Sequence, residues 1–323
     1  GKCYPGAQGH CQVLHRQKHA SVLLWNKLEG VNLPSELIGI FRHWYENQVN
    51  CVRWGEERSE EYKVECGVRQ GGLTSPRLFN LYVDQLVRAL SSMRAGCLID
   101  GVIVHNISYA DDMVLLSPSI SGLRGLLNAC EAYAESHGLK YNTTKSELLV
   151  FAAGSNSPRN VPPVKLCGTA LTRVKQFKYL GHIVTEDLKD DQDVERERRA
   201  LSVRSNMLAR RFAHSSEQVK ITLFKAYCQS FYTSSLWVRY TQKAYNALRV
   251  QYNNAFRMWL RLAWRCSASG MFAEARTNYF YAIIRKKMYS LMNRVCGSRN
   301  PILRAEAGKC ESPIRHHWTT VLV

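Results

Sequence analysis

Two adjacent aspartates, Asp111 and Asp112, interrupt the apolar stretch ISYADDMVLLS at residues 107–117. Neighbouring carboxylates repel each other, and burying them costs free energy unless a cation neutralises them. A tight turn between two strands would project both side chains to a point where their oxygens can bind Mg²⁺ together with phosphate groups. A structural role is the alternative, because aspartate favours turns through hydrogen bonds to its own backbone.

The segment before this pair, GVRQGGLTSPRLFNLYVDQL at residues 67–86, favours the chemical interpretation. Gly71 and Gly72 would let the backbone approach a base pair or a phosphate, where a side chain would clash. The small Ala110 would leave room beside a metal ion for the same reason. Gln70 could hydrogen-bond a base or sugar edge, or it could satisfy its own loop.

Together these segments resemble the reverse transcriptases of non-LTR (LINE-type) retrotransposons. Tyr109 to Asp112 resemble the YADD box of that family, in which the first aspartate binds metal directly and the second supports it. A second group resembles the loop and helix that contact the template strand and the incoming nucleotide: Arg69, Gln70, Gly71, Ser75, Pro76, Phe79 and Asn80.

Two later segments extend the resemblance, which covers most of residues 23–300. One resembles the palm motif whose lysine lies near the pyrophosphate leaving group, and it comprises Gly138, Leu139, Asn142 and Lys145. The other resembles the primer-grip hairpin and comprises Phe177, Tyr179, Leu180 and Gly181. A solvated surface charge remains the alternative for a lone lysine such as Lys145.

The resemblance implies an RNA-directed DNA polymerase that acts by two-metal nucleotidyl transfer. Its cofactor would be Mg²⁺, bound by Asp111 and Asp112, and its catalytic residues would be these two aspartates and Lys145. Its partners would be an RNA template, a DNA primer and deoxynucleoside triphosphates. The implied nucleotide and nucleic-acid contacts are Arg69, Gln70, Gly71, Tyr109, Ala110, Tyr179, Leu180 and Gly181.

The sequence departs from the family at the remaining catalytic aspartate, which belongs to a strand with the pattern Asp-x-x-x-Ala-Phe-Asp. The equivalent place, CQVLHRQK at residues 11–18, contains no acid, and the first aspartate of the chain is Asp84. Asp84 matches a helix position that binds no metal in the family. We therefore expect residues 1–22 to be atypical or foreign sequence and this polypeptide alone to be inactive or severely impaired.

Two other hypotheses remain. The chain could be a non-catalytic nucleic-acid-binding remnant of a retroelement. It could also be the translation of a pseudogene, without a stable product.

The elements that must position these residues follow from hydrophobic periodicity and turn signals. Before the Asp pair, we predict two helices within residues 23–48, a hairpin of residues 50–54 and 62–66, and a helix from Ser75 to about Ala95. Two short strands within residues 102–116 would place the Asp pair at their turn. After them we predict a helix from Ile120 that Gly138 stops and a strand at 147–151. This order predicts an α+β fold with one antiparallel sheet, which the resemblance identifies as a right-hand polymerase palm.

The rest of the chain is predicted to be a loop at 154–163, a hairpin in VKQFKYLGHIV (174–184) and helices beyond Glu186. We therefore divide the chain into an atypical segment (1–22), a partial palm (23–187) and a basic, all-helical thumb-like region (188–323).

The net charge of +18 lies entirely in the second half of the chain. Residues 1–150 contain 15 Lys and Arg against 15 Asp and Glu, whereas residues 151–323 contain 29 against 11. Such an imbalance favours a polyanionic partner, here an RNA–DNA hybrid. We expect Arg257, Arg261 and Arg265, four residues apart on one helical face with Trp259 and Trp264 nearby, to contact its phosphates; a solvated helix face with the tryptophans in the core is the alternative.

The eleven cysteines are irregularly spaced, which favours reduced thiols and an intracellular, nuclear or cytoplasmic, protein that is not secreted. No apolar run is long enough for a membrane span. The oligomeric state is not predicted.

Overall fold

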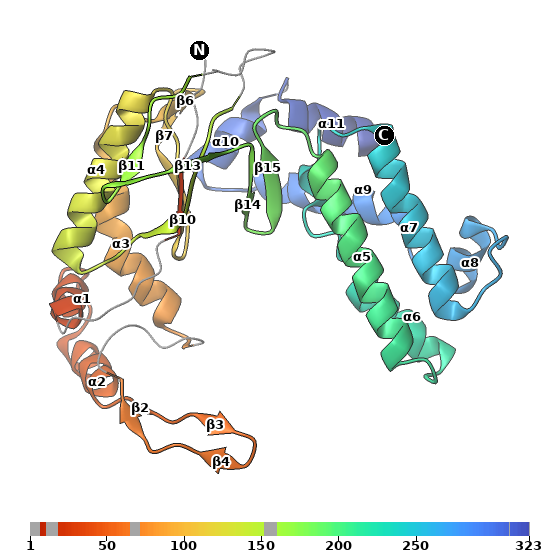
Figure 1. Ribbon diagram of the computed structural model, residues 1–323, viewed down its shortest axis with the longest axis horizontal. Helices are drawn as coiled ribbons and strands as arrows, with labels where there is room; N and C mark the ends of the chain where they lie inside the picture. Colours follow the sequence, from red (N-terminus) through yellow and green to blue (C-terminus); the bar gives the residue numbers. More distant parts are fainter. Residues whose placement is uncertain (1–6, 11–18, 65–71, 152–159, 310, 323) are drawn as a thin grey trace. The chain divides into compact units, whose positions relative to one another are not determined.

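The computed structural model describes residues 7–10, 19–64, 72–151, 160–309 and 311–322, and the chain divides into two compact units (Figure 1). Unit 1 comprises residues 1–174 and unit 2 residues 175–323. This division precedes the hairpin at residues 176–185, whereas the sequence analysis placed the domain boundary after residue 187. The hairpin is grouped with the helices that follow it because buried hydrogen bonds fasten it to them.

The described part of unit 1 contains four helices, and they follow the predicted order. They are α1 (His19–Glu29), α2 (Ser35–Glu46), α3 (Ser75–Ser92) and α4 (Ile120–His137). The predicted start of α3 at Ser75 is confirmed, with Thr74 as its N-cap, and the helix ends three residues before Ala95. Gly138 ends α4 as predicted, since its φ of 63° is in the left-handed region that glycine adopts without strain.

The main sheet of unit 1 has five strands in the order β13-β10-β1-β9-β8. Their bounds are β1 (Ala7–His10), β8 (Asn106–Tyr109), β9 (Asp112–Leu115), β10 (Asn142–Leu149) and β13 (Thr172–Val174). The mixture of helices and strands confirms the α+β class. The prediction of a wholly antiparallel sheet is wrong, because β13 runs parallel to β10. The sequence analysis did not predict β1, which pairs antiparallel with both β9 and β10 at the centre of the sheet.

Eight shorter strands of unit 1 form two-stranded pairs. These are β2 (Val49–Asn50) with β5 (Tyr62–Lys63), β3 (Arg53–Trp54) with β4 (Glu57–Arg58), β6 (Cys97–Ile99) with β7 (Val102–Val104), and β11 (Lys165–Leu166) with β12 (Thr169–Ala170). The first two pairs confirm the hairpin predicted around residues 50–66. The last two pairs were not predicted.

The core of unit 1 lies between the sheet and two helices, α3 and α4, which pack against each other (Figure 1). The apolar stripe of α4 is buried there, and Leu123 is only 1% exposed. It packs with Leu86 and Leu90 of α3 and with Leu115 and Leu148 of the sheet. Burying this stripe determines which face of strands β9 and β10 packs against the helices.

Unit 2 begins with the predicted hairpin and continues as helices. Its elements are β14 (Gln176–Tyr179), β15 (His182–Thr185), α5 (Asp191–Arg211), α6 (Glu217–Cys228), the 3₁₀ helix η1 (Ser234–Leu236), α7 (Gln242–Leu260), α8 (Ala268–Glu274), α9 (Phe280–Cys296), α10 (Pro301–Gly308) and α11 (Pro313–Leu322). Within residues 186–309 and 311–322 there is no strand, as predicted. An aromatic core that includes Phe224, Trp237, Tyr252 and Phe256 holds the helices together.

Over the described ranges, none of the helices combines the length and the apolar composition needed to cross a membrane. The cysteines at positions 51, 97, 130, 167, 228, 266 and 296 are free thiols.

Candidate functional site

The Asp pair lies where strands β8 and β9 of the main sheet meet. Tyr109 pairs with Asp112, so that Ala110 and Asp111 alone form the turn. Asp112 was expected in the turn but is instead the first residue of β9. Ala110 has a positive φ of 52°, and its small side chain makes this left-handed conformation less costly than a bulky one would. The tip exposes Asp111, whereas Asp112 is half-buried.

Two strand ladders position Asp112, while the turn alone positions Asp111. Asp112 pairs with Tyr109 of β8 on one side and with His10 of β1 on the other. Tyr109, directly opposite Asp112, is 65% exposed. Since directly paired residues place their side chains on the same face of a sheet, Tyr109 and Asp112 share one face. The turn thus exposes Asp111, while the exposed Tyr109 ring lies on the same face of the sheet as Asp112.

Lys145 comes from β10, which begins at the same edge of the sheet as β9. Asn142 and Asp112 both lie opposite His10, so β9 and β10 run parallel on either side of β1. Two strand spacings separate their first residues, which corresponds to about 10 Å. Lys145 is exposed and lies where the register of β10 shifts, between Asn142 and Glu147. The Asn142 side chain shapes this irregular segment, because its Oδ1 accepts a hydrogen bond from the Lys145 backbone N–H (3.2 Å).

Other residues of the resemblance have structural roles here. Gly138 caps α4, and Leu139 is buried in the cluster that joins α1, α2 and α3. Ser75 and Pro76 form the first turn of α3. The predicted contacts Arg69, Gln70 and Gly71 lie outside the residues that the structure describes.

The hairpin β14–β15 of unit 2 has a two-residue turn, Leu180–Gly181, between the paired Tyr179 and His182. Leu180 has a φ of 46° and Gly181 a φ of 87°. Both central residues have a positive φ, as in the type I′ turn that is common in two-residue β-hairpins. Leucine is strained in this conformation. Leu180 is 39% exposed, so the turn presents an apolar side chain to solvent.

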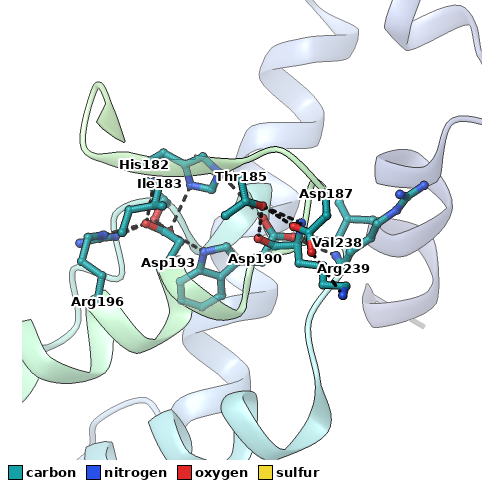
Figure 2. Close-up of polar contacts among 12 residues, drawn as sticks. His182, Ile183, Thr185, Asp187, Asp190, Asp193, Arg196, Val238 and Arg239 are labelled. Carbon is teal, nitrogen blue, oxygen red and sulfur yellow. Dashed lines mark hydrogen bonds and ion pairs between the residues drawn. The ribbon is translucent and has the colours of Figure 1, made fainter. Parts of the chain in front are cut away.

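A buried carboxylate, Asp193 of α5, fastens this hairpin to the helices (Figure 2). Its side chain is fully buried and accepts five hydrogen bonds. The donors are the Ile183 backbone N–H (3.0 Å), His182 Nδ1 (3.1 Å), Arg196 Nε (2.7 Å), Thr233 Oγ1 (2.6 Å) and Trp237 Nε1 (2.7 Å). We call Asp193 with these donors the Asp193 anchor.

The Asp193 anchor holds an ionised carboxylate away from water. Burial by itself raises the pKa of Asp193, but the hydrogen bonds from His182, Arg196, Thr233 and Trp237 outweigh burial and bring the pKa well below its usual range. The carboxylate therefore stays charged and keeps all its donors in place.

Asp190 adds a second carboxylate beside the same hairpin (Figure 2). Its Oδ2 accepts hydrogen bonds from the backbone N–H groups of Val238 and Arg239, both at 2.8 Å. Its Oδ1 lies 3.8 Å from His182 Nε2, so the imidazole lies between Asp190 and Asp193. Burial raises the pKa of Asp190, although these backbone hydrogen bonds lower it in part.

The sequence analysis missed this cluster, although the sequence contains a signal for it. The apolar stripe of α5 consists of Val194, Leu201 and Leu208, seven residues apart. Asp193 and Glu197 lie on the same stripe, where an acid needs buried partners. Acids on the apolar face of a helix in an otherwise basic region could have identified an ion-pair cluster.

The three arginines predicted on one helical face do not share one. Helix α7 ends at Leu260, and Arg261 has a φ of 56° as its C-cap, so Arg261 and Arg265 lie beyond the helix. Arg257 donates to the Cys266 backbone oxygen from Nε (3.1 Å) and from Nη2 (2.9 Å), which closes the segment that follows the helix. The prediction of a single face is therefore wrong; phosphate binding by these residues remains a prediction.

The two tryptophans near these arginines differ. Trp259 is 3% exposed and belongs to the core, as in the alternative interpretation. Trp264 is 77% exposed, and the Arg265 guanidinium lies 4.7 Å from its ring centroid. Trp264 and Arg265 thus keep an exposed ring and a charge side by side, as nucleic-acid binding would use them.

Residues 22–184 match the model of a protein family described as reverse transcriptase (RNA-dependent DNA polymerase). The chain is also similar to retrotransposon proteins. It is 30% identical over 195 residues to the Retrovirus-related Pol polyprotein from type-2 retrotransposable element R2DM of Drosophila melanogaster, which covers 55% of this chain and 17% of that protein.

Two further relatives match this chain with similar identities and coverages. Identity is 28% over 173 residues to the Retrovirus-related Pol polyprotein from type-1 retrotransposable element R2 of Nasonia vitripennis, covering 51% of this chain and 16% of that protein. It is 25% over 196 residues to the RNA-directed DNA polymerase from mobile element jockey of Drosophila funebris, covering 58% and 20%. The chain therefore aligns with about a fifth or less of the length of each relative.

Proposed function

The chain belongs to the reverse transcriptase (RNA-dependent DNA polymerase) family, and we propose that it forms the palm and thumb of a non-LTR retrotransposon polymerase. In this proposal, unit 1 is the palm, the hairpin β14–β15 is the primer grip and the helices of unit 2 are the thumb. The substrates are a DNA primer on an RNA template and deoxynucleoside triphosphates. The observation that carries the proposal is the β8–β9 turn, which exposes Asp111 beside the half-buried Asp112, with the strand of Lys145 starting at the same edge of the sheet.

The donor atoms at this turn suit Mg²⁺. Members of this family use divalent metal ions, and Mg²⁺ is commonly held by one or two carboxylates together with substrate phosphates. Asp111 and Asp112 would supply those carboxylates from adjacent positions. When bound, the ion would lower the pKa of the primer hydroxyl and neutralise charge on the triphosphate.

The remaining roles fall to residues around the two aspartates. Ala110 leaves space at the tip for the primer end, because its side chain is a single methyl group. Tyr109 lies on the same face as Asp112 and offers a ring to the terminal base pair. Lys145 is exposed on the strand that begins at the same edge and would balance the charge that develops on the leaving pyrophosphate.

We expect this activity to be weak in the chain as it stands. The central strand β1 has the sequence AQGH and contains no acid. Among the residues with described positions, no three His, Cys, Asp or Glu side chains converge on a common metal position. A second metal ion would need further bridging carboxylates, so two aspartates alone support two-metal chemistry poorly.

Primer extension on an RNA template with Mg²⁺ tests both claims. We expect slow extension that Asp111→Ala abolishes. Asp84→Asn is the matched control, because the Asp84 carboxylate forms a surface ion pair with Arg88 Nε (2.6 Å) one turn along α3. Extension that survives Asp111→Ala would contradict the assigned metal ligand, while rapid processive synthesis by the unaltered chain would contradict the proposed impairment.

A non-catalytic nucleic-acid-binding protein is the second candidate function. The excess of 29 basic over 11 acidic residues in positions 151–323 favours it, because that charge needs no catalytic site. This candidate predicts salt-sensitive binding of RNA–DNA hybrid that is unchanged when both aspartates are replaced, together with no extension under any condition.

A further inference from the structure

The side chain of Tyr232 lies beside the turn of the hairpin β14–β15 and remains 69% exposed. A Cβ atom added to Gly181 would lie 3.3 Å from Tyr232 Cε1 and 3.5 Å from Cδ1. The ring therefore covers the bare backbone of the turn while most of its surface faces solvent. A ring with this exposure can stack against a bound base.

The backbone before Tyr232 is held in an unfavourable conformation. Phe231 has a φ of 30°, although its side chain is bulky and fully buried. Its ring packs against Tyr252 and Phe280, with centroid distances of 5.5 Å to each. Such strain persists only where the surrounding structure enforces it, and it is concentrated at functional sites. Here it sends consecutive side chains in opposite directions, with Phe231 in the core and Tyr232 outside.

The Asp193 anchor joins the segment that carries Tyr232 to the hairpin. Asp193 accepts hydrogen bonds from Thr233, the residue after Tyr232, from Trp237, five residues after it, and also from the Ile183 N–H of β15. Figure 2 shows His182 and Ile183 of the hairpin meeting Asp193 from one side. One buried charge thus holds both segments, so the Tyr232 ring and the Leu180–Gly181 turn form one preorganised surface.

The chemistry of this surface suits a nucleotide. An exposed aromatic ring stacks on any base or sugar, and a glycine backbone permits close approach. Leu180 adds an exposed apolar side chain, and Lys178 lies two residues before it in the strand. The acids beneath the surface, Asp190 and Asp193, are buried and hydrogen-bonded, so they present little negative charge to a phosphate.

We propose that Tyr232 and the Leu180–Gly181 turn form a stacking site for the 3′-terminal nucleotide of the DNA primer. The inference rests on the proposed function, because it takes β14–β15 to be the primer grip. It adds a residue from the segment between α6 and α7 to that grip. Tyr232 would hold the primer end, while the chemistry would remain with the aspartates of unit 1.

Equilibrium binding tests the proposal without metal or nucleotide. The probe is an RNA–DNA hybrid whose recessed primer carries 2-aminopurine at its 3′ end, because stacking quenches this base. Loss of one stacked base corresponds to roughly 5- to 150-fold in affinity. We therefore expect Tyr232→Ala to raise the Kd by at least about fivefold and to restore the fluorescence of the terminal base. Tyr232→Phe keeps the ring and should match the unaltered chain.

Tyr289→Ala is the matched control, since Tyr289 of α9 is 55% exposed and should leave the Kd unchanged. A cooperative melt confirms that each variant is folded. A folded Tyr232→Ala variant with unchanged Kd and quenching would overturn the proposal. So would a change in oligomeric state without a change in Kd, because the ring would then cover a second copy of the chain.

The outcomes also separate this inference from the proposed function. If Asp111→Ala abolishes extension but Tyr232→Ala binds the hybrid normally, the polymerase stands and the stacking site does not. If the unaltered chain fails to bind the hybrid, both are refuted.

Discussion

At the scale of single residues, the buried carboxylate of Asp193 joins three segments of unit 2. Asp193 receives donors from the hairpin, from its own helix and from the segment before α7. A buried carboxylate without partners would be strongly destabilising, so its value lies in holding these three segments in one arrangement. A charge of this kind fixes position better than an apolar contact, because each donor has a direction.

We predict that Asp193→Asn destabilises the chain by roughly 3–5 kcal/mol, the usual cost of breaking a buried ion pair. The amide loses the charge that Arg196 requires, and its NH₂ group faces donors instead of acceptors. Urea unfolding measures the change, with Glu274→Gln as an exposed control on α8. A loss similar to that of the control would show that the anchor contributes little.

Asp193 also makes the stability of the chain depend on pH, and its lowered pKa gives the direction of that dependence. The folded pKa of Asp193 is lowered, so its contribution to stability is complete above the unfolded value of about 4 and is lost as pH falls toward the folded pKa. The Asp193→Asn variant should therefore lose less stability than the unaltered chain between neutral and acidic pH.

At the scale of elements, the strand β1 decides what the main sheet can do. It lies between β9 and β10, and its last residue, His10, is opposite Asp112. The resemblance places the missing acid pattern at residues 11–18, directly after β1, whereas an acid at position 10 would come from the strand next to the Asp pair. The strand register therefore identifies position 10 as the place where an added acid can be tested.

We predict that His10→Asp raises the rate of Mg²⁺-dependent primer extension by about tenfold or more, because a third carboxylate supports a second metal ion. Gln8→Asp is the control, since Gln8 pairs with Val114, two positions further along the strand. Equal gains from both variants would mean that negative charge alone, and not the register, is responsible. No gain from His10→Asp would show that β1 does not supply the missing position.

At the scale of the whole molecule, the second half of the chain supplies the charge and the first half supplies the candidate chemistry. The excess of basic residues begins after residue 150, and unit 2 includes most of that part of the chain. Counterion release makes hybrid binding steeply dependent on salt. Arg257 at the end of α7 also has a use within the fold, since its guanidinium donates to the Cys266 oxygen, and we expect it to contribute less to this binding than Arg261 and Arg265.

We predict that replacing Arg261 and Arg265 by Gln lowers the slope of log affinity against log salt by about two, one for each phosphate contact. Arg257→Gln should instead cost about 1 kcal/mol of stability, since it removes hydrogen bonds to the Cys266 oxygen, and should leave the slope unchanged. Titrations at several salt concentrations and a denaturant melt distinguish the two effects. A reduced slope in the Arg257 variant alone would reverse the assignment.

The sequence by itself determined the local features. We predicted the β8–β9 turn, the end of α4 at Gly138 and the hairpin around Leu180–Gly181. These features are predictable because turn formation and short-range periodicity depend on residues that are close in the sequence. The motifs around these turns also indicated the family to which the chain belongs.

Only the tertiary structure decided the features that join distant segments. Asp193 meets Thr233 and Trp237 across 40 and 44 residues of chain. The strand β1 pairs with β9 and β10 across more than a hundred residues, and its four-residue sequence gives no sign of that place. Arg261 looked helical by its spacing, yet the chain turns at that residue because packing around the helix end outweighs local propensity. Long-range contacts have no local pattern, so they appear only once the chain is folded.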